Sequence, residues 1–193
     1  NESLAIHQQV KQQLIDQGVI GDQGVEHDPY TAPEMEAKLI GLISNGQSID
    51  LAKPGDKIEV ILPSTPFYVE SGGQISDTGI IAQYSARGGE PTWEIEITDT
   101  RRVLPGLIVH VGVVKSGKPK IGDDCLAIVD FDRRLDIMRN HTATHLLQAQ
   151  LRSILGQHVQ QAGSLVAPDR LRFDFTHGSM LTQDEIARLS ENA

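Results

Sequence analysis

The feature that most constrains the fold is a change in hydrophobic pattern close to residue 132. Before it, short apolar segments rich in Val and Ile alternate with turns that contain Gly or Pro, such as Lys53-Pro54-Gly55-Asp56. After it, apolar residues recur at helical spacing from Leu135 to Leu155, and Gly156 follows them. A two-residue period fits strands and a 3.6-residue period fits helices, so the two regions must fold differently. We therefore expect an α+β protein.

The region before the change carries evenly spaced strand patterns. Five of them lie at residues 58–62, 79–84, 92–98, 107–114 and 125–130. A further apolar run from Glu34 to Ile43 fits either a helix or a strand, and we favour a strand because the tight-turn pair Asn45-Gly46 follows it. Such regular short strands predict a small β-barrel, which we place at residues 30–131.

Helical patterns stand on both sides of the predicted barrel. Apolar residues from Leu4 to Ile15 predict an amphipathic helix, so residues 1–29 form a short helical lead-in and linker. Residues 132–193 predict a long helix, a hairpin of residues 158–166 and 170–175, and a last helix at 181–189 capped by Thr182. This gives a helix-on-antiparallel-sheet core, which we expect to be truncated at its C-terminal end. Since the chain also lacks an initial Met, we expect it to be a piece of a longer protein.

Composition narrows the function classes. No apolar run approaches the roughly 20 residues of a membrane helix, and no secretory signal opens the chain, so we expect a cytoplasmic protein without a membrane partner. The single cysteine, Cys125, excludes an internal disulfide, and its strand pattern predicts a buried thiol.

Charge is divided unevenly along the chain. Residues 1–100 carry 5 Lys and Arg against 16 Asp and Glu, a net charge of −11, whereas residues 101–193 carry 12 against 10, a net charge of +2. The total of −9 argues against non-specific binding to DNA or RNA. Within residues 133–172, however, six arginines face only two aspartates: Arg133, Arg134, Arg139, Arg152, Arg170 and Arg172. Arginine binds phosphate with two donors at once, so a local site for one RNA end is compatible with this pattern, as is ordinary pairing with nearby acids.

Two constellations could carry chemistry. The first is His141-Thr142-Ala143-Thr144-His145, in which the i and i+4 spacing puts both imidazoles on one helix face, where they could share a metal ion. Two ligands are half of a zinc site, and a hydrogen-bonded surface pair remains the alternative. Possible third ligands without a diagnostic spacing are several carboxylates and the side chains of His110, Cys125, His158 and His177.

The second constellation is the segment from Phe67 to Gln74, which ends in Gly72-Gly73-Gln74. Adjacent glycines allow a backbone to approach a ligand closely, and the amide of Gln74 can both donate and accept hydrogen bonds. A plain Gly-Gly turn is the alternative interpretation.

Taken together, three segments resemble the editing region of the bacterial alanyl-tRNA synthetase family. They are residues 65–79, 139–147 and 163–175, and their order and separation match as well. The resemblance runs from about residue 30 to the end, and the lead-in is similar in character to the helical stretch before that region. A freestanding alanyl-tRNA editing protein shares the histidine motif and barrel, and threonyl-tRNA synthetase carries a related editing fold, so both are alternatives.

The resemblance implies hydrolysis of the ester in mischarged Ser-tRNA(Ala) and Gly-tRNA(Ala). By this resemblance Thr144 and Gln74 are the catalytic residues, and His141 and His145 bind zinc with a Cys and a His from a C-x-x-x-H element further along the chain. The sequence up to Ala193 contains no such element, and Cys125 does not match it. We therefore expect this chain alone to bind zinc weakly and to be weakly active or inactive. Substrate contacts are assigned to Gly72, Gly73, Arg133, Arg134, Arg139, Arg170 and Arg172.

The partner implied by the resemblance is the acceptor end of tRNA(Ala). The parent enzyme would ligate alanine to this tRNA with ATP and Mg²⁺ in a catalytic domain outside the chain. Two other classes stay open: a non-catalytic tRNA-docking module with structural histidines, and a metallohydrolase of a small ester. The sequence does not predict an oligomeric state.

Overall fold

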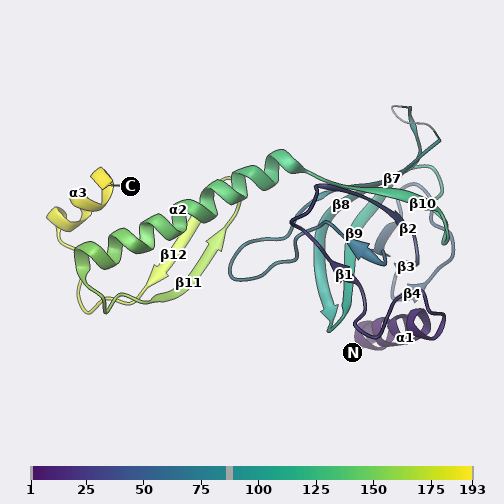
Figure 1. The fold of residues 1–193 in the computed structure, drawn as a ribbon, viewed down its shortest axis with the longest axis horizontal. Coiled ribbons are helices and arrows are strands. Elements are labelled where there is room, and N and C mark those ends of the chain that lie inside the picture. Colours follow the sequence, from purple (N-terminus) through teal and green to yellow (C-terminus); the bar gives the residue numbers. More distant parts are fainter. Residues whose placement is uncertain (1, 86–88, 193) are drawn as a thin grey trace. The chain divides into compact units, whose positions relative to one another are not determined.

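The structure is a computed structural model that describes residues 2–85 and 89–192. These residues form two compact units (Figure 1). The first unit runs to Glu70 and continues from Ser76 to Asp130, and the second comprises Ser71–Ile75 and the chain from Phe131 onward. A five-residue loop, far from the rest of the second unit in sequence, is therefore part of it.

The first unit is built around an eight-stranded sheet in the order β2-β10-β7-β8-β9-β5-β3-β4, with antiparallel pairing throughout. The strands are β2 (Glu34–Lys38), β3 (Gly41–Ser44), β4 (Gln47–Ser48), β5 (Lys57–Ile61), β7 (Gly79–Tyr84), β8 (Pro91–Leu104), β9 (Leu107–Ser116) and β10 (Asp124–Val129). Two more short strands, β1 (Glu26–His27) and β6 (Ser64–Thr65), pair in parallel beside it.

The predicted small barrel is not confirmed: the hydrogen-bonded order of the described strands does not return on itself, so they form no closed barrel. Only Leu39 and Ile40 connect β2, at one edge, to β3, next to the other edge, so the sheet has to curve strongly. At this seam the backbone of Leu39 bonds to Gly122 and Asp123, in the segment before β10. These loop bonds take the place of the strand pairing that would close a barrel.

The five predicted strands before residue 131 are all present, and the run after Glu34 is strand, as favoured. Asn45 and Gly46 have positive φ angles of 50° and 73° and form the β3–β4 turn. This is the backbone of a two-residue hairpin with the predicted tight turn. Strand β8 is longer than expected because β8 and β9 pair as far as Leu104 and Leu107, and only Pro105 and Gly106 turn between them.

Alternating side chains along β8 build the core of the first unit. Trp93, Ile95 and Ile97 are at most 1% exposed, whereas Glu96 between them is exposed. Trp93 donates from Nε1 to Oδ2 of Asp123 at 2.8 Å, which satisfies the polar atom of its ring. Burial of such a large side chain contributes more than any single hydrogen bond in the sheet.

The predicted N-terminal helix is present as α1 (Glu2–Asp16) and belongs to the first unit. Val10 and Leu14 pack in a core cluster with Leu107 and Ile108 of β9. The helix also carries the buried His7, whose Nε2 lies 2.6 Å from Oε2 of Glu59 on β5. Both apolar and polar contacts therefore fix α1 to the sheet.

The second unit is a helix packed on a two-stranded sheet, as predicted. Helix α2 (Phe131–Leu155) contacts both strands of the hairpin β11 (Gln161–Val166) and β12 (Leu171–Phe175), and it also contacts α3 (Gln183–Asn192). Strand β11 starts three residues later than expected, because Gly156 has a φ of 114° and its carbonyl accepts a bond from Val159 in a turn.

Helix α3 begins with the predicted cap. The hydroxyl of Thr182 accepts a bond from the Glu185 amide at 3.3 Å, and the Glu185 carboxylate accepts one from the Thr182 amide at 2.8 Å. This reciprocal capping box satisfies two backbone donors at the helix start.

Two expectations about composition can be compared with the structure. Cys125 is buried in β10 and free, and burial raises the pKa of its thiol to about 12. Among the described helices, none combines the length and the apolar character that crossing a membrane requires.

His110 on β9 shows how the first unit holds a polar side chain in its core. Its Nδ1 lies 3.0 Å from the carbonyl oxygen of Val60, which only accepts, so Nδ1 carries the proton. Nε2 then accepts a bond from the Thr65 hydroxyl at 2.7 Å. The neutral ring is thus fully satisfied, and burial lowers the pKa of His110 from 6.5 to about 4.

We expect the first unit to lose stability as the pH falls from 6.5 to 4. In this window the unfolded chain protonates His110 and the folded protein does not, so each proton taken up favours unfolding; above pH 6.5 both states are neutral and the effect disappears. The loss should approach roughly 3 kcal/mol at the acid end. Urea unfolding at several pH values measures it.

The matched control for this measurement is a pair of variants. His110→Gln should flatten the pH dependence within the window, whatever its effect on stability at pH 7. The exposed His145→Gln should leave the dependence as it is. An unchanged pH dependence in His110→Gln would contradict the assignment.

Candidate functional site

The predicted Gly-Gly-Gln segment forms a tight turn in the second unit. Ser71 and Gln74 exchange two backbone hydrogen bonds of 3.2 and 3.0 Å across Gly72 and Gly73. The two glycines have φ angles of 60° and 86°, so both central residues are left-handed, as in a type I′ turn. Residues other than Gly, Asn and Asp rarely adopt a left-handed backbone at two successive positions.

Backbone bonds hold this turn beside β11. The Val166 amide donates to the Gly73 carbonyl at 2.8 Å, and the Ile75 amide donates to the Val166 carbonyl at 3.2 Å. Ser164 also donates its hydroxyl to the Gly72 carbonyl at 3.3 Å. The loop therefore runs along the hairpin as a short parallel extension of it, and the position of Gln74 is set by backbone contacts.

The side chain of Gln74 reaches helix α2. Its Oε1 lies 2.6 Å from Nδ1 of His141, although the two residues are 67 positions apart. Gln74 is buried and His141 is partly buried. The two constellations found separately in the sequence thus meet at one hydrogen bond.

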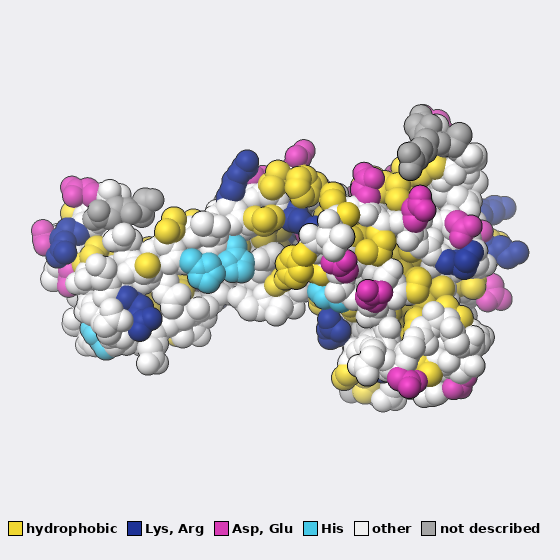
Figure 2. All heavy atoms as spheres, in the orientation of Figure 1, with side chains coloured by type: hydrophobic (Ala, Val, Ile, Leu, Met, Phe, Trp, Pro, Cys, Tyr) yellow, Lys and Arg dark blue, Asp and Glu magenta, His cyan; other side chains and the backbone are white. Residues whose placement is uncertain are grey.

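His141 and His145 lie one helical turn apart with their rings stacked. The ring centroids are 5.0 Å apart and the ring planes differ by 22°. Histidine side chains are seen at the surface over α2 in Figure 2. Two imidazoles on one exposed face fit half of the donor set of a tetrahedral zinc site, and the described residues contain no group of three or more potential metal ligands.

The other potential ligands named from the sequence lie elsewhere. His110 and Cys125 are buried in the first unit. His158, before β11, and His177, after β12, contact each other. Nε2 of His158 lies 3.0 Å from Nδ1 of His177. A third ligand for His141 and His145 is therefore not supplied by any of these four.

Thr144 lies at the i+3 position from His141 on α2 and directly precedes His145. It is buried, and its hydroxyl donates to the Asn140 carbonyl at 2.8 Å. A threonine in a helix often makes such a bond to its own i−4 carbonyl, and the bond alone does not indicate a functional role. The bond uses the hydroxyl proton and leaves the Oγ1 lone pairs able to accept a hydrogen bond.

Two residues without a predicted role help to position the site. Asn140 donates from Nδ2 to the carbonyls of Ala167 at 2.8 Å and Pro168 at 3.1 Å, which ties α2 to the hairpin turn. Ser164 contacts the glycine turn. The sequence offered one sign of this role for Asn140. An asparagine in the middle of a helix lowers its stability unless the side-chain amide has a hydrogen-bond partner elsewhere.

Three of the predicted substrate arginines form exposed ion pairs with nearby acids. Arg139 pairs with Asp136 at 2.8 Å, Arg170 with Asp169 at 3.3 Å and Arg172 with Asp174 at 3.2 Å. Their side chains are 65–75% exposed, and such surface pairs contribute little stability. These guanidinium groups can therefore exchange a carboxylate for a phosphate at low cost. Arg133 and Arg134 lie in the first turn of α2, and Arg134 is buried.

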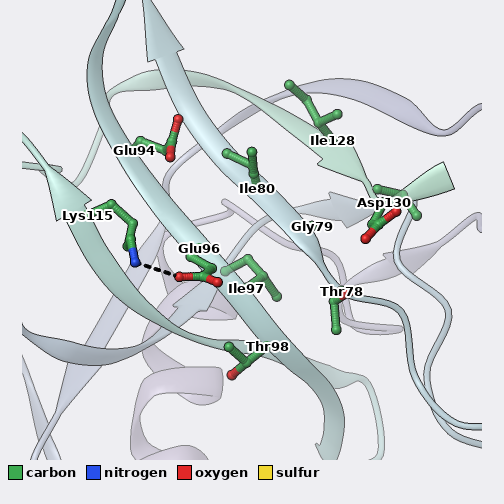
Figure 3. Close-up of a pocket in the computed structure, with 11 residues that line it drawn as sticks. Thr78, Gly79, Ile80, Glu94, Glu96, Ile97, Thr98, Lys115, Ile128 and Asp130 are labelled. Atoms are coloured by element: carbon green, nitrogen blue, oxygen red, sulfur yellow. Dashed lines mark ion pairs between the residues drawn. The ribbon is translucent and has the colours of Figure 1, made fainter. Parts of the chain in front are cut away.

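A separate groove of about 720 Å³ lies on the sheet of the first unit (Figure 3). Glu94, Glu96 and Asp130 give it an acidic lining, and Lys115 pairs with Glu96 at 2.9 Å. None of the site residues predicted from the sequence lines this groove.

Several known proteins are similar to this chain over most of its length. The family described as tRNA synthetases class II (A) matches residues 3–133. An alanine–tRNA ligase from Chloroflexus aurantiacus is 50% identical over 155 residues, 80% of this chain and 17% of the relative. Another from Anaeromyxobacter sp. is 47% identical over 182 residues, 94% of this chain and 18% of the relative, and that match is long enough to include the histidine motif. The Thermus thermophilus ligase is 46% identical over 160 residues, 83% of this chain. The chain thus spans less than a fifth of the length of these relatives.

The two glycines of the turn should respond differently to substitution. A Cβ at Gly73 would lie 2.6 Å from the Ser164 carbonyl oxygen, whereas a Cβ at Gly72 would meet nothing within 4 Å. Gly72→Ala should therefore cost about 1–2 kcal/mol for its left-handed φ alone, and Gly73→Ala should cost more and displace the loop from β11. Denaturant unfolding and amide exchange of Val166 measure the two effects.

Gly72→Asn serves as the control, because Asn tolerates a left-handed φ and should retain most of the stability. Equal costs for Gly72→Ala and Gly73→Ala would contradict the close packing of the turn on Ser164.

Proposed function

Since this chain belongs to the tRNA synthetases class II (A) and its relatives are alanine–tRNA ligases, we propose that it is the editing region of such a ligase. The proposed reaction is hydrolysis of the ester that joins serine or glycine to tRNA(Ala). The observation that carries the proposal is the hydrogen bond between Gln74 and His141, in the unit that also holds Thr144. The freestanding editing protein is less favoured, because the family match extends over the lead-in and the first unit.

The need for a second site follows from the size of alanine. A pocket that fits alanine cannot keep out the smaller glycine, and an apolar pocket rejects serine poorly, because an added hydroxyl is a weak basis for exclusion. A separate hydrolytic site corrects the error only if it also spares Ala-tRNA. Such a site must recognise the serine hydroxyl with a polar group.

Thr144 is suited to this recognition. Its hydroxyl proton is committed to the Asn140 carbonyl, so Oγ1 faces any further partner as an acceptor. Serine can donate its hydroxyl proton to that atom, and alanine has no donor to offer. The i−4 bond therefore orients the acceptor and is compatible with a functional role.

Hydrolysis itself needs little beyond positioning. Water attacks the ester carbonyl, the bond to the ribose oxygen breaks, and the amino acid leaves as a carboxylic acid while the tRNA regains its hydroxyl. His141 and His145 would hold zinc together with ligands from outside this chain. When bound, the metal would supply positive charge that orients the amino acid or the RNA end, or lowers the pKa of the attacking water.

We propose that the exposed arginines Arg139, Arg170 and Arg172 contact the acceptor end of tRNA(Ala). Arg133 and Arg134, at the start of α2, are weaker candidates because the first is half-buried and the second is buried. We also propose that the whole protein acts in the cytoplasm and ligates alanine to tRNA(Ala) with ATP and Mg²⁺ in a catalytic domain outside this chain.

We expect Thr144→Val, made in a full-length alanine–tRNA ligase that contains this segment, to lower the ratio of Ser-tRNA(Ala) to Ala-tRNA(Ala) hydrolysis rates by at least about 10-fold, as loss of one buried hydrogen bond implies. Valine keeps the shape and removes the acceptor. Deacylation of both aminoacyl-tRNAs measures the ratio. Thr142→Val, on the exposed side of α2, is the matched control and should leave the ratio unchanged.

Retained selectivity in Thr144→Val would contradict the role of Thr144. If deacylation were absent from the unaltered enzyme, the non-catalytic docking interpretation would replace editing. Cleavage of small esters that lack RNA would instead favour a general metallohydrolase.

We expect the double variant Arg170→Glu with Arg172→Glu to weaken tRNA(Ala) binding by roughly 10-fold or more near 100 mM salt. The slope of log affinity against log salt should become shallower by about one for each lost phosphate contact. Filter binding across a salt series measures both. The double variant Lys118→Glu with Lys120→Glu, at two exposed positions of the first unit, makes the same change in net charge and is the control. Equal affinities of the arginine double variant and the unaltered enzyme would dispose of the contact.

A further inference from the structure

We propose that Gln74 is a positioning residue that fixes the tautomer of His141. In this role the amide oxygen of Gln74 accepts a hydrogen bond from Nδ1–H of His141, and the imidazole is left with an unprotonated Nε2. The inference assigns the Gly-Gly-Gln loop to the orientation of a metal ligand, and Gln74 does not act directly on the ester. The tautomer itself does not depend on the proposed function; only the use of Nε2 as a zinc ligand rests on it.

Gln74 and His141 are in direct contact. Nδ1 of His141 lies 2.6 Å from Oε1 of Gln74, and this oxygen can only accept. With this oxygen as the partner, the proton sits on Nδ1. In a neutral imidazole the second nitrogen then has a free lone pair, and a neutral imidazole nitrogen is the form that binds zinc.

The backbone of Gln74 is held rigidly. Both neighbours along the chain bond to Val166 of β11, through the Gly73 carbonyl and the Ile75 amide, and Ser71 closes the turn. The side chain of Gln74 is 8% exposed. Because its backbone is anchored and its amide is largely removed from water, the glutamine can hold the ring in one orientation.

His141 is anchored through the preceding residue. Asn140, its neighbour on α2, donates to the carbonyls of Ala167 and Pro168, so the helix is tied to the same hairpin that carries the loop. The hairpin thus fixes both partners of the Gln74–His141 bond. His145, exposed and stacked on His141, has no comparable tie among the hydrogen bonds described for α2.

The geometry has one chemical alternative. If the amide of Gln74 were rotated by 180°, its NH₂ group would donate to an unprotonated Nδ1, and Nε2 would carry the proton. Such a ring could not bind a metal through Nε2. The two arrangements therefore differ in whether Nε2 of His141 carries a proton, and this can be observed directly.

The experiment is ¹⁵N–¹H correlation of the histidine rings in this 193-residue chain, without metal, near pH 7.5. We expect His141 to show a protonated Nδ1 and an unprotonated Nε2. Gln74→Leu should remove this preference, and Gln74→Glu, whose carboxylate also accepts from Nδ1–H, should restore it. The rings of His158 and His177 report whether the second unit keeps its fold, and Gln83→Leu in the first unit is the matched control.

A second readout is binding of Zn²⁺ alone to the same variants. Loss of a group that orients a metal ligand typically costs 10- to 100-fold in affinity, so Gln74→Leu should fall in about that range while Gln74→Glu stays near the unaltered chain. An unprotonated Nδ1 in the unaltered chain, or an unchanged tautomer in Gln74→Leu, would overturn the proposal. Because neither measurement uses tRNA, a failure of ester hydrolysis in the full-length enzyme would count against the proposed function alone.

Discussion

The second unit depends on one backbone condition, two consecutive left-handed residues at Gly72 and Gly73. This turn lets Ser71 and Gln74 pair with each other while the chain runs along β11. A Cβ at Gly73 would enter the space of the Ser164 backbone. The contact between Gln74 and His141 follows from this arrangement, since neither side chain could reach the other if the loop stood away from the hairpin.

The same chemical device occurs in both units. In the first, His110 donates from Nδ1 to a carbonyl and accepts at Nε2 from Thr65, so a neutral ring is stable in the core. In the second, Nδ1 of His141 lies 2.6 Å from the amide oxygen of Gln74, and the tautomer that we propose leaves Nε2 for another partner. In a neutral imidazole, an acceptor beside one nitrogen places the proton there and leaves a lone pair on the other nitrogen. That lone pair can accept a hydrogen bond, as in a structural histidine, or bind a metal ion.

Local patterns predicted most elements of the fold. Helical spacing from Leu135 to Leu155 predicted α2, the Asn45-Gly46 pair predicted a tight turn, and Thr182 was the predicted cap of α3. The predicted barrel is not confirmed. Whether a sheet closes depends on which of its strands pair, and the local hydrophobic pattern of one strand does not specify its neighbours. The length of β8 was missed for a related reason, since pairing with β9 as far as Leu107 extends a strand beyond its own apolar pattern.

By itself, the sequence determined the periods, the turns and the motifs, including two histidines on one helix face and a Gly-Gly-Gln loop. These are short-range properties, set by backbone φ preferences and by side-chain spacing along one element. Only the tertiary structure decided that Gln74 and His141 meet, that Thr144 donates its proton to Asn140, and that His110 and Cys125 lie in the core of the other unit. Those facts depend on which distant segments pack together, and packing is settled by the sum of many contacts that no single stretch of residues contains.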